Sequence, residues 1–290
     1  MTPTIIVQAR VESRRFPSKM LATLLGQPMV LRLLDRLVQY FPREQIWLAT
    51  PATDANKPLL ELARRHGYQA ANPVCDSDDV LARYFWLAQN SQADPVIRIT
   101  GDCPLIDGEV IQQALNLYND DKTLDYVALA SEWGDGLDCE VIRFSALEKA
   151  HQEATLPTDR EHVTPFLWRQ PERFKQALLL CPFDLSGQRW SVDTRQDLDF
   201  LEMVLWMLAE YGKSDTHTWR DVYAVLRHHA SYIEKQFPGL LLQPSARNAD
   251  YMRQVAREQG DAATGKTWKQ ARYGIQDHGN DPRPDLSTER

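Results

Sequence analysis

Short apolar runs rich in β-branched residues alternate with longer segments of helical periodicity in the first half of the chain. The short runs predict buried strands over residues 4–7, 46–49 and 96–100. The longer segments carry apolar residues at helical spacing and predict helices over residues 21–39, 58–66, 77–90 and 108–118. Strands that alternate with helices of this length form right-handed βαβ units, so this half predicts a mostly parallel sheet.

The pattern becomes mixed in the second half. Apolar runs predict strands over residues 126–129, 137–142, 174–180 and 189–192. Helical patterns cover residues 145–154, 159–170, 195–210 and 218–229. We expect some antiparallel pairings here, and therefore an α/β fold whose sheet is mixed but mostly parallel.

A change in character after about residue 245 predicts a division of the chain. Residues 1–244 contain the strands and helices named above and are expected to form one α/β domain. Residues 247–258 have the pattern of one more polar helix, and from Gly260 the sequence is poor in large apolar residues. Residues 245–290 are therefore expected to form a polar helical arm with a disordered or partner-dependent tail.

Charge and composition narrow the function. The net charge of −7 argues against general binding to nucleic acid, which requires a basic surface, but it leaves a local nucleotide site open. No apolar run approaches the length of a membrane span, and the N-terminus lacks the basic-then-apolar pattern of a signal peptide. The four cysteines form no Cys-x-x-Cys pair, so we expect reduced thiols, no zinc site and a cytoplasmic location.

A basic segment follows the first predicted strand. Residues 9–19 contain three arginines and a lysine, with Glu12 as the one acidic residue. Open α/β sheets bind ligands at the carboxyl ends of their strands, where this segment lies. Arginine offers forked contacts and lysine a mobile point charge, so the segment suits a triphosphate. A solvated basic loop is the alternative interpretation.

Two aspartates follow predicted strands far apart in the sequence. Asp102 lies in Gly-Asp-Cys-Pro after residues 96–100, and Asp193 lies in Val-Asp-Thr after residues 189–192. A carboxylate at a strand end facing bound phosphates, as expected for Asp102, suits Mg²⁺, which takes one or two carboxylates together with phosphate oxygens. The alternative is that Asp102 and Asp193 only cap the helices that follow, a role that Thr194 also suits.

Together these motifs resemble the cytidylyltransferases that make CMP-activated sugar acids, such as the CMP-Kdo synthetases and acylneuraminate cytidylyltransferases. Residues 9–19 resemble their loop Ala-Arg-x-x-Ser-x-Arg-x-Pro-x-Lys. Residues 135–140 and 159–165 resemble segments of the branch that contains the spore coat polysaccharide biosynthesis protein F. The resemblance spans about residues 4–205. It implies a Rossmann-like nucleotidyltransferase fold of the nucleotide-diphospho-sugar transferase type, with three α/β/α layers.

Carried over position by position, the resemblance implies a set of nucleotide-binding residues formed by Ala9, Arg10, Ser13, Arg15, Lys19, Asp79, Arg83 and Asp102. It assigns the catalytic role to Arg10, Arg15, Lys19 and Asp102, and the magnesium ion to Asp102 and Asp193. The loop departs from the commonest family pattern at Glu12, Arg14 and Ser18, which leaves the charge pattern intact but makes the loop less flexible. An Arg-Gly pair expected near Asn72 is missing, which leaves recognition of the base open.

The resemblance also suggests a substrate-binding set formed by Asp138, Glu140, Arg160 and His162. Asp138 and Glu140 are two residues apart and would point to one face of a strand. Arg160 and His162 could bind a carboxylate or phosphate of the acceptor. The alternatives are that Glu140 simply pairs with Arg160 and that His162 is structural.

The function that these residues imply is a magnesium-dependent nucleotidyltransferase of the cytidylyltransferase type. It would transfer CMP from CTP to a sugar acid or related acceptor and release pyrophosphate, in surface polysaccharide biosynthesis. By resemblance we also expect a homodimer. A glycosyltransferase that uses a nucleotide sugar and a non-catalytic nucleotide-binding module are the alternatives. The first is disfavoured because no Asp-x-Asp pair follows a central predicted strand.

Overall fold

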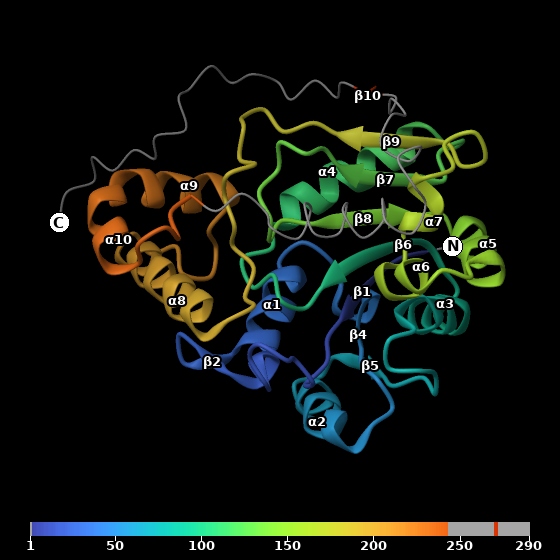
Figure 1. Ribbon diagram of the computed structural model, residues 1–290, viewed down its shortest axis with the longest axis horizontal. Helices are drawn as coiled ribbons and strands as arrows, with labels where there is room; N and C mark the ends of the chain where they lie inside the picture. The colour runs from blue at the N-terminus through green and yellow to red at the C-terminus, as the bar shows by residue number, and fades with distance from the viewer. Residues whose placement is uncertain (1, 243–269, 272–290) are drawn as a thin grey trace.

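A mixed sheet runs through the centre of the molecule (Figure 1). The computed structural model describes residues 2–242 and 270–271. Within them the strand order is β10-β9-β7-β8-β6-β1-β4-β5. The strands are β1 (Thr2–Gln8), β4 (Ile46–Ala49), β5 (Gln69–Ala71), β6 (Ala93–Thr100), β7 (Tyr126–Leu129), β8 (Cys139–Ile142), β9 (Gln176–Leu179) and β10 (Gln270–Ala271). Strand β8 pairs antiparallel with β6 and β7, and the other neighbours pair in parallel.

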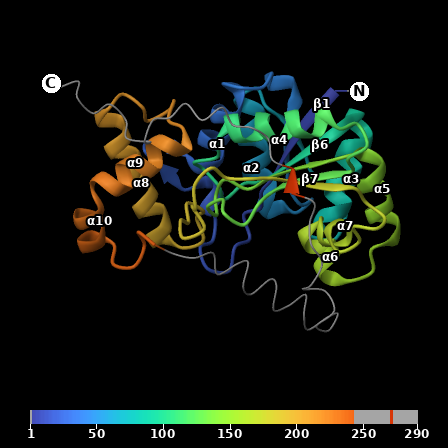
Figure 2. The same cartoon turned by 90° about the horizontal axis from the view of Figure 1, so that it is seen from above.

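Helices cover both faces of this sheet, as Figure 2 shows from above. They are α1 (Met29–Val38), α2 (Lys57–Arg65), α3 (Val80–Ser91), α4 (Gly108–Asp120), α5 (Phe144–Glu153), α6 (Pro157–His162), α7 (Pro165–Trp168), α8 (Arg195–Glu210), α9 (Trp219–His228) and α10 (Ala230–Gln236). Strand β1 separates the two layers, because Ile5 and Val7 belong to one buried cluster and Ile6 to the other. The predicted three-layer α/β/α fold with a mixed, mostly parallel sheet is confirmed.

Each cluster joins a different set of helices to the sheet. Helices α1, α2, α4, α8 and α9 contribute to the larger cluster. Helices α3, α5 and α7 contribute to the smaller one on the opposite face. Helices α8, α9 and α10 gather at one end of the molecule, drawn in orange in Figure 1. The start of α8 therefore lies where this end group meets the sheet, next to the functional residues described below.

The predicted helix over residues 21–39 is wrong in its first part. The chain there forms a hairpin of β2 (Thr23–Leu24) and β3 (Gln27–Pro28), and α1 begins at Met29. Gly26 adopts φ +78°, a conformation that favours glycine and that closes the turn. Pro28 has no N–H to donate and stands just before the helix rather than inside it.

Two other predicted elements also differ. The helix over residues 159–170 is broken into α6 and α7, because Val163 between them has φ +72° and leaves the helical conformation. Residues 189–192 form no strand of the sheet. They run beside the loop that follows β7 and form one isolated bridge there, between Asp135 and Arg189.

Some predictions concern parts of the chain that lie outside the described residues. These are the polar helix over 247–258 and the tail from residue 260, apart from Gln270–Ala271 in β10, so the division into 1–244 and 245–290 stays a prediction. In the described part of the chain, no helix combines the length and the apolar character needed to cross a membrane. The four cysteines are all described, and all are free thiols.

A buried histidine fixes the loop between α8 and α9 against α1. The Arg36 guanidinium donates to the backbone oxygen of His217 at 3.0 Å, and it lies 3.2 Å from Nδ1 of the same residue. Burial, and then the positive charge of Arg36, lower the pKa of His217 from 6.5 to about 3. The imidazole is therefore neutral in the folded protein at neutral pH.

This predicts a loss of stability in mild acid. Between pH 6.5 and about 3 the unfolded chain binds a proton at His217 that the folded protein does not. The free energy of unfolding therefore falls as pH falls, by at most about 1.4 kcal/mol per pH unit from this residue. Urea unfolding of native protein and His217→Gln between about pH 5 and pH 7.5 should give a shallower slope for the variant. His66→Gln, at an exposed position, should keep the native slope; equal slopes in all three proteins would contradict the account.

Candidate active site

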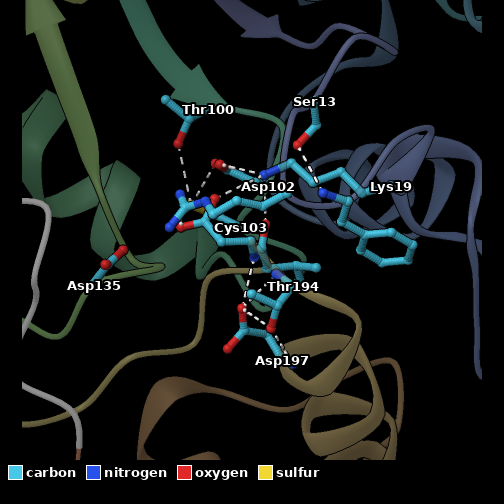
Figure 3. A network of polar contacts seen from close by, with 12 residues as sticks. Ser13, Lys19, Thr100, Asp102, Cys103, Asp135, Thr194 and Asp197 are labelled. Carbon is cyan, nitrogen blue, oxygen red and sulfur yellow. Dashed lines mark hydrogen bonds and ion pairs between the residues drawn. The ribbon is translucent and has the colours of Figure 1, made fainter.

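The ends of three parallel strands bring the predicted functional segments together. Strand β1 is followed by residues 9–19, β4 by residues 50–56 and β6 by Asp102, and all three leave the same edge of the sheet. Figure 3 shows residues from the loop after β1, the end of β6 and the start of α8 meeting at this edge. The sequence prediction that these distant segments form one site is consistent with this arrangement.

The ammonium group of Lys19 lies at the centre of the site. It is 3.1 Å from Oδ2 of Asp102 and 3.2 Å from Oδ1 of Asp193, and it donates to the backbone oxygen of Val192 at 2.6 Å. All three side chains are buried, with at most a tenth of each exposed. Two carboxylates brought from distant parts of the chain therefore share a single buried positive charge.

Backbone contacts place these two carboxylates. The amide of Gly101 donates to the backbone oxygen of Gln8 at 2.8 Å, which joins the ends of β6 and β1. A Cβ at Gly101 would lie 2.8 Å from that same oxygen, so glycine is required for the close approach. The amide of Val192 donates to the backbone oxygen of Asp102 at 2.8 Å, which brings the segment before α8 against the end of β6.

The other predicted phosphate-binding residues line the loop. Arg15 reaches Oδ2 of Asp193 at 2.9 Å although 64% of its side chain is exposed. Arg10 pairs with Asp78 at 2.7 Å on the surface. Ala9 is buried and its amide donates to the backbone oxygen of Ala49 at 3.0 Å, so it fixes the start of the loop. Ser13 accepts from a backbone amide within the loop.

Glu12, where the family loop commonly has glycine, ties the loop to the segment after β4. Its carboxylate accepts hydrogen bonds from the Thr53 hydroxyl and the Asn56 amide, each at 2.8 Å. The Asn56 side chain in turn accepts from the amide of Val11 at 2.9 Å. Partial burial opposes ionisation, but the hydrogen bonds prevail and lower the pKa of Glu12. The segment after β4 thus holds the loop in place. This adds to the lower flexibility that follows from a residue other than glycine at position 12.

Asp79 and Arg83 stabilise the segment that precedes α3. Arg83 is fully buried and donates to the backbone oxygens of Asp76 at 3.1 Å and Ser77 at 2.9 Å. Asp79 caps α3 by accepting from the amide of Ala82 at 2.9 Å. Both residues therefore shape the segment that carries Asp78, the partner of Arg10. Direct contact between either residue and a nucleotide stays a prediction.

The four predicted substrate-binding residues lie around β8 and α6. The alternative that Glu140 pairs with Arg160 is wrong. Glu140 pairs with Arg98 on the neighbouring strand and also accepts from the hydroxyls of Tyr126 and Thr164. Arg160 pairs with Asp79 and donates to a backbone oxygen of α5 at 2.8 Å.

The remaining two members of this set lie at ends of elements. Asp138 is exposed just before β8 and accepts from the amide of Gly136 at 3.0 Å. His162 ends α6. Of the four residues, Asp138 is the one that lies in the loop between β7 and β8, which approaches the site. Contact between any of the four and an acceptor stays a prediction.

The sequence interpretation missed Arg189. Its guanidinium contacts Asp193 and Asp197, at 2.9 and 2.8 Å, and it is itself largely buried. No sequence pattern indicated a role for Arg189, because residues 189–193 belong to no helix or strand. The contacts of these residues depend on how the loop after β7 packs against them. A Cβ at Gly136 would lie 2.6 Å from the backbone of Trp190, so this packing requires glycine there.

The carboxylates of Asp102 and Asp193 fit a magnesium ion that is bound together with substrate phosphates. No group of three or more His, Cys, Asp or Glu side chains within the described residues could hold a metal on its own. Asp102 and Asp193 nevertheless already share one cation, the ammonium of Lys19. Mg²⁺ binds through one or two carboxylates together with substrate phosphates, so two carboxylates that converge on one point suit it.

Comparison with known proteins agrees with the geometry. A family model described as cytidylyltransferase matches residues 4–234. The chain belongs to this family. The predicted resemblance and the predicted enzyme class, a nucleotidyltransferase of the cytidylyltransferase type, are both confirmed.

Several members can be compared in detail. An uncharacterised protein of Methanocaldococcus jannaschii is 33% identical over 201 residues, which cover 68% of this chain and 81% of that protein. The spore coat polysaccharide biosynthesis protein SpsF of Bacillus subtilis is 25% identical over 215 residues, which cover 68% and 83%. The structure of a cytidylyltransferase from Leptospira borgpetersenii superimposes with a TM-score of 0.75 at 26% identity, over 81% of this chain and 98% of that one.

Because Asp102 and Asp193 share the ammonium of Lys19, we expect Lys19→Met to change both the stability of the protein and its response to Mg²⁺. Removing the ammonium takes from Asp102 its buried ion pair and leaves this carboxylate facing Asp193, which keeps Arg15 and Arg189, so the free energy of unfolding should fall by about 3–5 kcal/mol. Added Mg²⁺ without nucleotide should then restore part of that loss, because a divalent cation replaces the missing charge between Asp102 and Asp193. Urea unfolding with and without Mg²⁺ at matched ionic strength measures both effects.

Lys57→Met provides the control, since Lys57 pairs with Asp54 on the exposed surface. It should be close to native stability and should not respond to Mg²⁺. A Lys19→Met protein as stable as the native one and indifferent to Mg²⁺ would show that the two carboxylates do not depend on a shared cation.

Proposed function

We propose that this protein transfers CMP from CTP to a sugar acid or a related acceptor, with release of pyrophosphate and with dependence on Mg²⁺. The observation that supports this most is that Lys19 contacts both Asp102 and Asp193. Arg15 also contacts the carboxylate of Asp193. The site combines cations suited to phosphates with carboxylates suited to a divalent metal. It lies at the strand ends where this class of fold binds its ligands.

The reaction needs no nucleophile from the protein. A hydroxyl oxygen of the acceptor attacks the α-phosphorus of CTP, forms a new P–O bond and gives up its proton to water. The bond between the α-phosphorus and the oxygen that leads to the β-phosphate breaks, and pyrophosphate leaves with the electron pair. The task of the chain is to hold the triphosphate in line with the acceptor and to neutralise the charge that builds on the leaving group.

The cations of the loop suit this task because each contacts a carboxylate in the free protein and is therefore already placed to contact an anion. Arg10 pairs with Asp78, Arg15 with Asp193, and Lys19 with both aspartates of the centre. In our proposal these three residues exchange carboxylate partners for phosphate oxygens when CTP binds. The exposed side chain of Arg15 can make this change at little cost. Lys19 is buried, and it would place its point charge nearest the reacting phosphate.

Asp102 and Asp193 would hold the magnesium ion. When bound there, it would neutralise charge on the α-phosphate and orient it towards the acceptor. Since Lys19 is shared between these carboxylates in the free protein, release of its ammonium towards the phosphates leaves both of them available. Metal and triphosphate would therefore enter the site together.

The acceptor and the pathway are inferred from resemblance. Motifs of this chain resemble those of enzymes that activate sugar acids, and the name of the Bacillus subtilis relative places that protein in polysaccharide biosynthesis. We extend both to this chain, as a cytoplasmic homodimer that activates an acidic sugar for a surface polysaccharide. The substrate-binding residues proposed for the acceptor are Asp138, Glu140, Arg160 and His162. Of these, Glu140 is the most fully engaged with its neighbours.

Asp102→Asn tests the chemistry. The variant removes one charge from the proposed metal site while Asp193 still balances Lys19, so the protein should fold. Turnover, measured as pyrophosphate release from CTP with a panel of sugar acids, should fall by about 10²-fold or more. Thermal unfolding of the same preparations checks the fold.

Asp199→Asn is the matched control, because Asp199 lies on an exposed turn of α8 paired with Arg195. Its turnover should equal that of the native protein. Native turnover in Asp102→Asn would exclude Asp102 from the metal site.

A further inference from the structure

Arg189 holds three carboxylates with one guanidinium. It contacts Oδ1 of Asp197 at 2.8 Å and Oδ2 of Asp193 at 2.9 Å, and its Nε lies 3.7 Å from Oδ2 of Asp135. Only 12% of its side chain is exposed. Burial alone would lower the pKa of Arg189, but the carboxylates, Asp197 first, raise it above its usual value. The side chain is therefore a fixed positive charge inside the protein.

Asp197 links this charge to the backbone of the site. Its Oδ2 accepts hydrogen bonds from the amides of Asp193 at 2.9 Å and Thr194 at 2.7 Å. Thr194 returns the contact through its hydroxyl, which accepts from the amide of Asp197 and completes a capping box at the start of α8. Figure 3 shows Thr194 and Asp197 together at the start of α8. Arg189 thus holds the side chain of Asp193, and Asp197 holds its main chain.

The two ends of the Asp193 carboxylate have different partners. Oδ1 faces Lys19, while Oδ2 contacts Arg15 and Arg189. Under the proposed function, Lys19 and Arg15 turn to the phosphates when nucleotide binds. Arg189 differs from them because it is buried and because it is tied to Asp197 at the same time. It is the partner of Asp193 that stays in place through the reaction.

We propose that Arg189 is a positioning residue, which fixes the carboxylate of Asp193 in the orientation that binds the metal–triphosphate complex. The inference rests on the proposed function. It requires the planar fork of arginine, because one nitrogen faces Asp193 while another faces Asp197. Lysine at this position would keep the charge but could not hold both carboxylates in a fixed relative orientation.

The test uses Arg189→Gln and Arg189→Lys, with Arg195→Gln as the matched control. Arg195 also pairs with an aspartate four residues later, but on the exposed face of α8. For each protein the melting temperature is measured at saturating CTP over a Mg²⁺ titration, and again with CTP in the absence of metal. The other nucleoside triphosphates are run alongside, and the one that stabilises the native protein most is used. The KM for Mg²⁺ and kcat follow from pyrophosphate release.

We expect the Mg²⁺ midpoint to rise about tenfold or more in both Arg189 variants, as happens when an outer partner of a metal-binding group is removed. The shift produced by the triphosphate without metal should stay near native, because Arg10, Arg15 and Lys19 are unchanged. The KM for Mg²⁺ should rise by a larger factor than kcat falls. Arg195→Gln should match the native protein in every measurement.

A structural role alone would give a different result. It would lower the melting temperature without ligand but leave the Mg²⁺ midpoint within about twofold of native, and that outcome in Arg189→Lys overturns the inference. If Arg189→Gln does not fold, the Mg²⁺ midpoint of Arg189→Lys alone tests the inference. This variant is expected to fold because it retains the charge that balances the buried carboxylates. A native protein that shows no metal-dependent response to any triphosphate overturns the proposed function, and this inference with it.

Discussion

The ammonium of Lys19, shared between the buried carboxylates of Asp102 and Asp193, is the interaction on which the site depends. Burying a carboxylate without a partner is costly, and two that face one another cost more. Without the lysine, the end of β6 and the segment before α8 would repel one another at the point where Val192 bonds to Asp102. The ammonium of Lys19 thus joins the end of β6 to the segment before α8. It also holds together the residues proposed to carry the chemistry.

The surroundings of this charge divide into a fixed part and an exchangeable part. Arg189 and Asp197 are buried and pair with one another, and Asp197 also accepts from the backbone amides of Asp193 and Thr194, so they form the fixed part. Arg10 and Arg15 are more exposed and each contacts a carboxylate across the loop. A site of this kind can exchange carboxylates for phosphates without rearranging its framework. Preorganisation of this sort reduces the cost of binding a highly charged ligand.

Sequence reasoning identified the residues at strand ends because their pattern is local. The basic loop after β1, Gly-Asp after β6 and Asp-Thr before α8 each follow an apolar run, and the parallel sheet brings such positions to one edge. It did not predict the hairpin before α1, where apolar residues at helical spacing concealed the turn at Gly26. It also missed Arg189, because the packing of two irregular segments near Gly136 determines its partners. It did not foresee that Glu140 pairs with Arg98 either, because that pair depends on the antiparallel register of β8 against β6, which joins parts of the chain about forty residues apart.

In our proposal Lys19, Asp102 and Asp193 form a site for a triphosphate with its metal. The most direct measurement is the melting temperature of the native protein with each of the four nucleoside triphosphates, with and without Mg²⁺. A ligand that binds only the folded state raises this temperature by mass action. The account predicts a rise that depends on Mg²⁺ and is largest with CTP. No rise with any triphosphate, or a rise that is the same with and without Mg²⁺, would contradict it.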